Sequence, residues 1–442
     1  MKTTERERLL KRGVSEIIVE SEFAELLDSG RSLRLKMGFD PSAPDLHVGH
    51  SVGLRKLRQF QDIGHRVVLI VGDWTAQIGD PSGLSHTRPM LTAEEVQENA
   101  KTYLAQFFKI VDRSKTEIRW QSEWFGKFSL TDVIQLTSRF TVAQFLARED
   151  FSNRYKSNQP IAITELLYPL LQAYDSIVVE SDVEFGGMDQ KFNLLVGRDL
   201  QRMMGQRPQQ CVLVPLLPGT DGVQKMSKSL GNYIGIDEPA NDIYGKTMSL
   251  PDQMIIPYLE NATDVPGPEL EEMRRAMADS SANPMEFKKL LARELVGQFH
   301  DGDAARSAEE SFERTVQGRE LPADVEEVWL SKSDITLMGG FPYDEMVKEY
   351  GLNVEAGTLK EDRPELGIQA GDIVVDIPDL LVRLELASSK GEGRKLLEQG
   401  SIAIDGRRLA PGPAGARAPA NVRDGSLIRR GPRRHKRVRF RD

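Results

Sequence analysis

The chain has 442 residues, of which 39% are hydrophobic and 28% are charged, and its formal net charge is −9. This composition is typical of a globular protein with two to four domains. It holds no run of eighteen apolar residues and only one cysteine, Cys211, which excludes a membrane-spanning helix and an internal disulfide framework. The first residues lack the apolar core of a signal peptide, so a cytoplasmic location is expected.

The first predicted strand covers residues 33–39, where apolar and polar residues partly alternate. A turn with two prolines follows at residues 40–45. Helical periodicity begins at His47, which places His47 and His50 in the first turn of a helix, where free N–H groups and the helix dipole favour anions. Gly49 between them lets a flat ring approach the backbone. Taken alone, the two histidines also fit ordinary residues at a helix start.

Further apolar runs alternate with helical stretches along the first half of the chain. Residues 65–73, 176–179 and 211–217 are nearly continuous apolar segments, typical of parallel strands buried on both faces. The pattern predicts a doubly wound, Rossmann-like parallel α/β sheet. A glycine-rich dinucleotide fingerprint is missing after the first strand. Residues 244–247 end like a phosphate loop, but Ala240 replaces its leading glycine, so we predict a helix there.

A second motif follows the 211–217 strand. Lys225 and Lys228 lie on a loop of small residues, where Ser227 and Gly231 would let the loop open and close. Lysine is a flexible point charge, which suits phosphates that move during a reaction. The lysines alone also fit a solvated basic loop. Together, the histidine and lysine motifs indicate an enzyme that handles ATP phosphates without a phosphate loop.

The charge is unevenly distributed along the chain. Residues 376–442 contain 16 Lys and Arg against 8 Asp and Glu, a net charge of +8, so the first 375 residues carry −17. An acidic body with a basic end predicts a polyanionic partner for that end. Helical periodicity dominates residues 241–325, whereas prolines and glycines punctuate residues 326–375, which we interpret as a linker region.

The residues of both motifs resemble the signature sequences of class I aminoacyl-tRNA synthetases. Four further stretches resemble the bacterial tyrosyl-tRNA synthetases: residues 38–47, 78–83, 171–175 and 186–190. The resemblance implies a Rossmann-like catalytic domain over residues 1–240, a helical anticodon-binding domain over 241–325, and an S-four-like α+β RNA-binding module over 376–442. It also implies a homodimer, with L-tyrosine, ATP with Mg²⁺ as its substrate complex, and tRNA(Tyr) as substrates. No protein-ligated metal is expected.

The resemblance also implies roles for individual residues. The catalytic contacts to the phosphates would come from Ser42, His47, His50, Arg88, Lys225, Lys228 and Ser229. The nucleotide would also contact Gly49, Gly187, Asp189 and Lys228. The tyrosine pocket would be formed by Asp40, Thr75, Asp80, Tyr168, Gln172, Asp175 and Gln190.

The phenol of the substrate is expected to meet Asp175. Tyr168, Gln172 and Asp175 are spaced i, i+4, i+7, so one helix face would present all three, although a solvated polar face has the same spacing. Lys36 stands where many family members have a tyrosine that shares the phenol contact. Its ammonium could lie beside Asp175 or point to solvent from the other face of the strand. Met37 and Leu84 also depart from the family. Lys36 and Leu84, together with the motif at residues 224–229 and the insertions, indicate the second bacterial subtype.

The basic end predicts a helix at residues 378–387, a second helix capped by Ser388 or Ser389, and a strand at 401–404. Residues 433–439 fit a final strand or a disordered basic tail, and residues 411–416 fit a flexible loop. A generic basic surface is the alternative to RNA binding. The residues expected on one RNA-binding face are Lys390, Arg394, Lys395, Arg407 and Arg408.

Two other functions fit part of this pattern. One is a different nucleotidyltransferase of the same superfamily, such as a tryptophan-specific synthetase, against which residues 171–175 and the basic end argue. The other is an RNA-binding or splicing-cofactor protein built on a synthetase scaffold. A complete set of phosphate-handling residues argues against a loss of activity.

Overall fold

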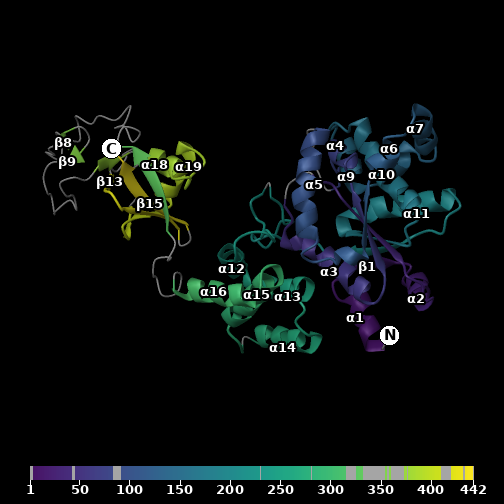
Figure 1. Ribbon diagram of the computed structural model, residues 1–442, viewed down its shortest axis with the longest axis horizontal. Coiled ribbons are helices and arrows are strands. Elements are labelled where there is room, and N and C mark those ends of the chain that lie inside the picture. Colours follow the sequence, from purple (N-terminus) through teal and green to yellow (C-terminus); the bar gives the residue numbers. More distant parts are fainter. Residues whose placement is uncertain are drawn as a thin grey trace. The chain divides into compact units, whose positions relative to one another are not determined.

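The computed structural model describes residues 3–41, 45–82, 91–228, 230–279, 281–314, 325–331, 354–355, 358–359, 373–375, 377–409, 420–431 and 434–441. The chain divides into two compact units, Met1–Glu309 and Glu310–Asp442 (Figure 1). The boundary that we predict near residue 240 lies inside the first unit. Within the described ranges, no helix is long and apolar enough to cross a membrane.

A six-stranded sheet forms the centre of the first unit, in the order β1-β6-β5-β2-β3-β4. The five strands from β2 to β6 are parallel, and β1 pairs antiparallel with β6 at one edge. All residues of β6 are buried, as expected for a strand covered on both faces. The strands are β1 (Glu16–Ile18), β2 (Arg34–Phe39), β3 (Arg66–Val71), β4 (Thr116–Trp120), β5 (Val183–Gly187) and β6 (Gln210–Val214).

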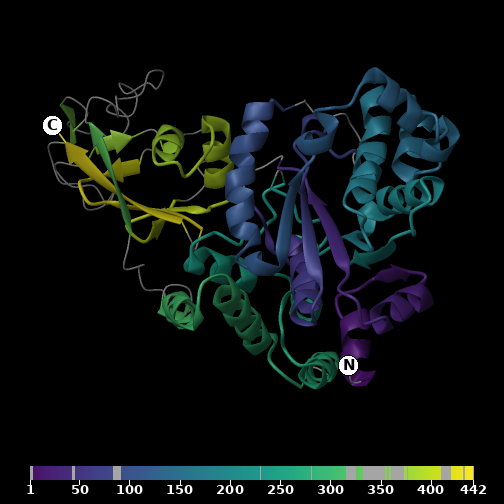
Figure 2. The same ribbon diagram turned by 45° about the vertical axis from the view of Figure 1, so that its right-hand side comes forward.

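Helices flank this sheet on both sides (Figure 2). Right-handed crossovers place α3, between β2 and β3, and α11, between β5 and β6, on opposite faces because the chain moves in opposite directions from β2 and β5. The helices are α1 (Thr3–Lys11), α2 (Glu20–Asp28), α3 (Val48–Asp62), α4 (Thr75–Ile78), α5 (Ala93–Phe107), α6 (Ser122–Phe125), α7 (Leu130–Thr137), α8 (Val142–Leu146), α9 (Glu149–Lys156), α10 (Ile163–Val178) and α11 (Lys191–Met203).

One predicted strand is wrong. Residues 176–178 form the last turn of α10, and the strand begins only at Val183. An apolar run buried between a sheet and a neighbouring helix has the same composition in a helix as in a strand, so periodicity cannot separate the two over four residues. The other two apolar runs contain β3 and β6, as predicted.

The end of the first unit is helical, as predicted. The segment that resembled a phosphate loop lies in α12, where Lys246 pairs with Glu238 at 2.5 Å. Helical periodicity also predicts a helix over residues 307–316; its part up to Phe312 lies in α16, which begins earlier, and residues 315 and 316 lie outside the described residues. These helices are α12 (Ala240–Met248), α13 (Ile255–Ala262), α14 (Gly267–Ala278), α15 (Pro284–Phe299) and α16 (Gly302–Phe312).

In the residues that the structure describes beyond α16, the second unit shows two small sheets and the helices α18 and α19. Its core joins α18 and α19 to the five-stranded sheet β12-β11-β14-β15-β7, with Leu380, Leu381 and Val438 fully or almost fully buried. The four-stranded sheet has the order β13-β10-β9-β8. The elements are β7 (Glu326–Ser331), β8 (Val354–Glu355), β9 (Thr358–Leu359), β10 (Ile373–Val375), α18 (Ile377–Arg383), α19 (Lys390–Glu398), β11 (Ile402–Ile404), β12 (Arg407–Arg408), β13 (Ala420–Val422), β14 (Leu427–Arg430) and β15 (Arg434–Arg441).

Two local predictions in this unit are confirmed, and one helix is shorter than expected. Ser389 caps α19 by accepting the Glu392 N–H, and the basic tail forms the strand β15. Helix α18 ends at Arg383 rather than near residue 387. β7 pairs in parallel with β15, so the start of the predicted linker is part of the same sheet as the C-terminal strand. The predicted loop at residues 411–416 lies outside the described residues.

Candidate active site

The predicted site residues gather where the strand order reverses. From β2 the chain adds β3 and β4 on one side and β5 and β6 on the other, so the reversal lies between β2 and β5. In a doubly wound sheet, ligands bind in the crevice outside the carboxyl ends of the strands at this point. Asp40 follows β2, and Gly187 ends β5 beside Asp189. The sheet therefore brings residues 150 positions apart in the sequence to one crevice.

His47 and His50 stack at the start of α3. His47 is the N-cap residue of that helix, and the ring centroids of the two histidines lie 3.8 Å apart. The His47 N–H donates to His50 Nδ1 at 3.2 Å. Any side chain at Gly49 would press on the His47 ring, because a Cβ atom there would lie 3.0 Å from His47 Nδ1. A side chain at this position would have to push the His47 ring aside by a few tenths of an ångström, so glycine fits best there.

Both imidazoles are neutral at physiological pH. Burial, followed by the charges of Lys225 and Lys228, lowers the pKa of His50 to about 3. Burial lowers the pKa of His47 even further below its usual range. His47 Nδ1 is buried and has no hydrogen-bond partner among the described residues. A neutral ring with an unpartnered nitrogen can exchange a hydrogen bond with a ligand without carrying a charge into the crevice.

The lysine segment lies against the histidine helix. Val48 N–H donates to the Ile234 carbonyl at 2.9 Å, and Gly49 N–H points at Met226 Sδ at 3.4 Å. Lys228 Nζ pairs with Asp45 at 2.5 Å, and Lys225 pairs with Asp189. Each ammonium group is thus paired with a carboxylate at the edge of the crevice. The phosphates of an incoming nucleotide would compete with these carboxylates for the two ammonium groups.

The end of β5 has no room for larger side chains. A Cβ atom at Gly187 would lie 2.6 Å from Asp189 Oδ1 and 2.7 Å from Leu216 Cδ2. Neither neighbour is the flexible end of a long side chain, so a substitution would displace the Asp189 carboxylate. The predicted nucleotide contacts at Gly187 and Asp189 are therefore next to each other in space, beside Lys225.

Three predicted tyrosine-pocket residues are joined directly. The Tyr168 hydroxyl donates to Asp40 Oδ2 at 2.8 Å, and the Thr75 hydroxyl donates to Asp40 Oδ1 at 2.7 Å. Burial and the charges of Asp40, Asp80 and Asp175 raise the pKa of Tyr168 well above its usual range. These carboxylates come from three separate parts of the chain, and all act on one phenol group.

Asp80 and Gln190 form a second pair. Gln190 Nε2 donates to Asp80 Oδ2 at 2.6 Å, and Gln190 Oε1 accepts from Asn193 at 3.1 Å. Asp80 also accepts the Ser82 N–H at 2.9 Å. The side-chain amide of Gln190 and the main-chain N–H of Ser82 together fix the orientation of the Asp80 carboxylate.

Asp175 lies deep in the same crevice. Its carboxylate accepts hydrogen bonds from Gln121 Nε2 at 2.8 Å and Trp124 Nε1 at 3.2 Å. Burial raises the pKa of Asp175 to about 7, and the nearby charge of Lys36 and the hydrogen bond from Gln121 oppose that rise. Gln121 Oε1 accepts the Thr75 N–H at 3.0 Å, which links Asp175 to the Asp40 group.

Lys36 does not point to solvent. Its ammonium forms a buried ion pair with Glu184 and donates to Ser176 Oγ and the Gln172 carbonyl, both at 2.7 Å. The Gln172 side chain donates to Glu184 Oε1 at 3.1 Å. Gln172, predicted to bind the substrate ammonium, is therefore held by the Lys36–Glu184 pair in this structure.

Met37 lies against α3, where a Cβ at Gly53 would be 2.7 Å from Met37 Cε.

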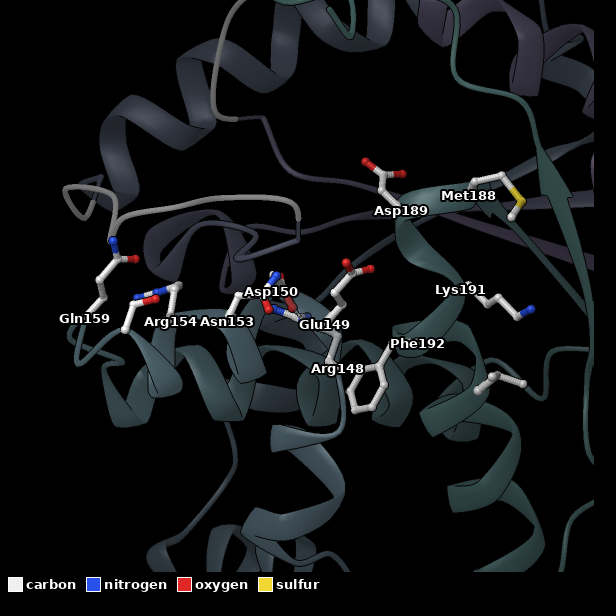
Figure 3. A pocket seen from close by; sticks show the side chains of 12 residues that line it. Arg148, Glu149, Asp150, Asn153, Arg154, Gln159, Met188, Asp189, Lys191 and Phe192 are labelled. Carbon is white, nitrogen blue, oxygen red and sulfur yellow. Dashed lines mark hydrogen bonds and ion pairs between the residues drawn. The ribbon is translucent and has the colours of Figure 1, made fainter.

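A cavity of about 840 Å³ opens beside Asp189, between α9 and the beginning of α11 (Figure 3). Its cations already have acidic partners: Arg148 pairs with Asp150 at 2.6 Å, and Lys191 pairs with Glu16 at 2.7 Å. Among the predicted site residues, Asp189 lines this cavity, and the pairing of these two cations leaves no cluster of unpaired charge at them. In the part of the chain that the structure describes, no three His, Cys, Asp or Glu side chains gather as a metal site.

Several predicted residues receive no structural account. Ser42, Leu84, Arg88 and Ser229, and the side chain of Arg407, lie outside the described residues. Sequence reasoning missed other residues that contact the predicted ones: Asp45, Gln121, Trp124 and Glu184. Gln121 and Trp124 directly follow β4, and recognition of that parallel strand would have directed attention to its carboxyl end.

A doubly wound sheet with neutral stacked histidines and two lysines at its reversal point defines a nucleotide-handling α/β enzyme. The family described as tRNA synthetases class I (W and Y) matches residues 28–317. The tyrosine–tRNA ligase of Dehalococcoides mccartyi (strain ATCC BAA-2266) is 53% identical over 97% of both chains. The tyrosine–tRNA ligase of Moorella thermoacetica is 44% identical over 98% of this chain and 95% of its own.

A solved structure shares the fold. The Archaeoglobus fulgidus tyrosyl-tRNA synthetase, crystallised with L-tyrosine, superposes with a TM-score of 0.58 at 23% identity, covering 70% of this chain and 99% of that chain. The chain belongs to the class I tRNA synthetases of the W and Y family and, within it, to the tyrosine–tRNA ligases.

Proposed function

We propose that the crevice between β2 and β5 carries the chemistry of tyrosine–tRNA ligation. The enzyme activates L-tyrosine with ATP to give tyrosyl-adenylate and pyrophosphate, and then transfers the tyrosyl group to the 3′ end of tRNA(Tyr). The observation that carries this assignment is the contact between the histidine helix and the lysine segment, with an unpartnered His47 Nδ1 between them.

The first half-reaction needs positioning more than acid–base chemistry. A carboxylate oxygen of tyrosine forms a bond to the α-phosphorus of ATP, and the bond from that phosphorus to the β-phosphate oxygen breaks. The nucleophile is already an anion, so no general base is required. Negative charge grows on the departing pyrophosphate, where Lys225, Lys228 and the neutral ring of His47 would stabilise it. Ser42, Arg88 and Ser229 are proposed as further phosphate contacts.

The lysines would change partners when ATP binds. Lys228 leaves Asp45 and Lys225 leaves Asp189, and the Asp189 carboxylate then becomes available to the ribose hydroxyls beside Gly187. We propose that ATP enters as its Mg²⁺ complex, with the metal carried by the phosphates of the substrate.

Tyrosine would lie between two groups of polar residues. Its ammonium would contact Asp80, Tyr168 and Gln172, with Gln190 orienting Asp80. Its phenol hydroxyl would donate to Asp175, which Gln121 and Trp124 hold in place. Asp40 and Thr75 support Tyr168 from the end of β2.

We propose a homodimer that uses α7, α8 and the start of α10. Four large apolar side chains there are strongly exposed: Leu130 (75%), Ile134 (58%), Val142 (60%) and Ile163 (79%). Such a concentration on one stretch of a folded chain favours a second copy as its cover. Sedimentation equilibrium of the wild type should give twice the chain mass, and Leu130→Lys with Ile163→Lys should give the single mass.

Residues 376–442, within the second unit, are proposed as an S-four-like RNA-binding module. The order in this stretch, α18 and α19 followed by β11 to β15, with a cap at Ser389, supports this proposal. Lys390, Arg394, Lys395 and Arg408 are all exposed, but Lys390 pairs with Asp379 at 2.7 Å. We therefore expect Arg394, Lys395 and Arg408, with Arg407, to contribute more to tRNA affinity than Lys390 does.

Pyrophosphate exchange across tyrosine, phenylalanine and tryptophan tests the function. Exchange that depends on tyrosine, followed by aminoacylation of tRNA(Tyr), is the expected result. Exchange that depends on tryptophan would instead identify a tryptophan-specific enzyme. RNA binding without any exchange would identify an RNA-binding protein on a synthetase scaffold.

A further inference from the structure

Asn232 lies four residues after Lys228 and is almost fully buried behind the lysine segment. Its side-chain amide has two N–H donors and a carbonyl acceptor. Nδ2 donates to Asp221 Oδ2 at 2.7 Å and to the Lys225 carbonyl at 3.2 Å. Oδ1 accepts the Ser227 N–H at 2.8 Å. One amide therefore joins the beginning of the segment to the peptides on both sides of Met226.

The main chain of Asn232 strengthens the same connection. Its carbonyl accepts the Thr220 N–H at 2.8 Å. Gly219 packs directly on Asn232, and any side chain at Gly219 would overlap both the amide and the carbonyl of Asn232. Asp221 accepts the N–H groups of Val223 at 2.8 Å and Gln224 at 2.9 Å. The segment from Gly219 to Lys228 is thus closed on itself through Asn232.

The closed segment is also docked on the histidine helix. Met226, between the two peptides that Asn232 holds, is buried and receives the Gly49 N–H on its sulfur. Lys225 and Lys228 lie on either side of this anchored point. Their main-chain positions relative to His47 therefore depend on the Asn232 amide.

We propose that Asn232 is a positioning residue for adenylate formation, which fixes the segment that presents Lys225 and Lys228 to the leaving pyrophosphate. The inference rests on the proposed function of those lysines. Asn232 itself would not contact the substrate. A displacement of about 1 Å in a charge-stabilising group can reduce a rate about 100-fold, so loss of the amide should act on the rate rather than on tyrosine binding.

The test is pyrophosphate exchange by the full chain with Asn232→Ala. We expect kcat to fall about 10- to 100-fold, while the dissociation constant for tyrosine changes less than twofold. Asn261→Ala is the matched control, since among the described residues its amide donates to the Pro257 carbonyl within α13 at 2.8 Å, and it should retain wild-type exchange. An equal loss of tyrosine affinity and rate in Asn232→Ala would show a purely structural role and overturn the proposal.

A double-mutant cycle gives the sharper result. If Asn232 acts through the lysines, Asn232→Ala should cost much less in a Lys228→Ala background than in the wild type. Fully additive losses would overturn the proposal. An inactive wild type would instead contradict the proposed function, so the two failures are distinguishable.

If Asn232→Ala fails to fold, exchanging the amide and the carboxylate between Asn232 and Asp221 provides a second test. Asn232→Asp places two carboxylates 2.7 Å apart, against Asp221, and should lower kcat at least 10-fold. Adding Asp221→Asn restores one donor between the two side chains and should recover at least threefold. No recovery in the folded double variant would contradict the role of this contact.

Discussion

Lys36 and Glu184 form an ion pair 3.0 Å long whose side chains are 0% and 1% exposed. Of the two orientations that we considered for Lys36, the solvent-facing one is wrong. The ammonium points inward, and its charge favours the ionised form of Asp175 through space. It is bonded, however, to Glu184, Ser176 and the Gln172 carbonyl. At the position where the resemblance implies a tyrosine, this chain therefore has one half of a buried ion pair.

Breaking this pair should destabilise the fold. Lys36→Met leaves the Glu184 carboxylate buried without its counter-charge, which should cost about 3–5 kcal/mol in unfolding free energy. Lys36→Met with Glu184→Gln removes both charges but keeps an acceptor for Gln172, so most of the stability should return. Urea unfolding of the two variants measures this. Equal destabilisation by both would show that packing, not the unpaired charge, causes the loss.

Asp175→Ala should abolish discrimination between tyrosine and phenylalanine. A carboxylate built to accept a phenol hydroxyl loses its partner when phenylalanine enters, and this penalty rejects phenylalanine, an effect already known for tyrosyl-tRNA synthetases. Tyrosine should lose about 2–4 kcal/mol in the variant, while phenylalanine loses little. Exchange kinetics with both amino acids measure the ratio. A variant that still rejects phenylalanine as the wild type does would remove Asp175 from this role.

The same carboxyl should make tyrosine use depend on pH. Its pKa is raised to about 7 by burial, with Lys36, Glu184 and Tyr168 as the charged or titratable groups around it. Below pH 7 the protonated group is a poorer acceptor, so kcat/KM for tyrosine should rise with pH through about 7, whereas phenylalanine should show no such step. His50, with a pKa of about 3, stays neutral in this window.

Stability should show the opposite pH trend at this residue. The folded-state pKa of Asp175 exceeds its unfolded value, so its contribution is full below pH 4 and is lost as pH rises through about 7. Asp175→Asn should therefore gain stability relative to the wild type between pH 5 and pH 8. Urea unfolding at those two pH values checks the sign.

Lys228→Ala should lower adenylate formation far more than tyrosine binding. The Lys228 ammonium pairs with Asp45 rather than with a predicted tyrosine-pocket residue, and it should meet growing negative charge only when ATP reacts. A loss of about 3 kcal/mol in activation free energy is typical of such a group. Single-turnover adenylation and tyrosine titration measure the two effects. Equal losses in both would contradict the assignment.

Removing the second unit should separate the two half-reactions. A cut after Val375 would leave β7 without its partner β15, so the structure favours a cut after Arg314, beyond α16. The shortened chain should fold and form tyrosyl-adenylate but transfer poorly to tRNA. Its tRNA affinity should fall less steeply with added salt than that of the full chain. Unchanged aminoacylation would argue against an RNA contact in this unit.

The sequence by itself determined the local features of this protein. Both signature motifs, the α/β alternation, the helix at α12 and the cap at Ser389 depend on neighbouring residues, whose backbone preferences and periodicity can be read directly. The family resemblance added the pocket residues. Asp40 lies at the carboxyl end of β2, while Tyr168, Gln172 and Asp175 come from α10, and the hydrogen bond from Tyr168 to Asp40 joins the two elements.

Only the tertiary structure decided which distant groups pair. Nothing near Lys36 in the sequence indicates Glu184, and nothing near Asp175 indicates Gln121 or Trp124. The strand that we predict at the end of α10 is wrong for a related reason. An apolar run indicates that its residues are buried, but it does not indicate whether their backbone is helical or extended. Pairing of buried charges depends on which elements lie side by side, and in this chain the order of the strands in the sheet sets that arrangement.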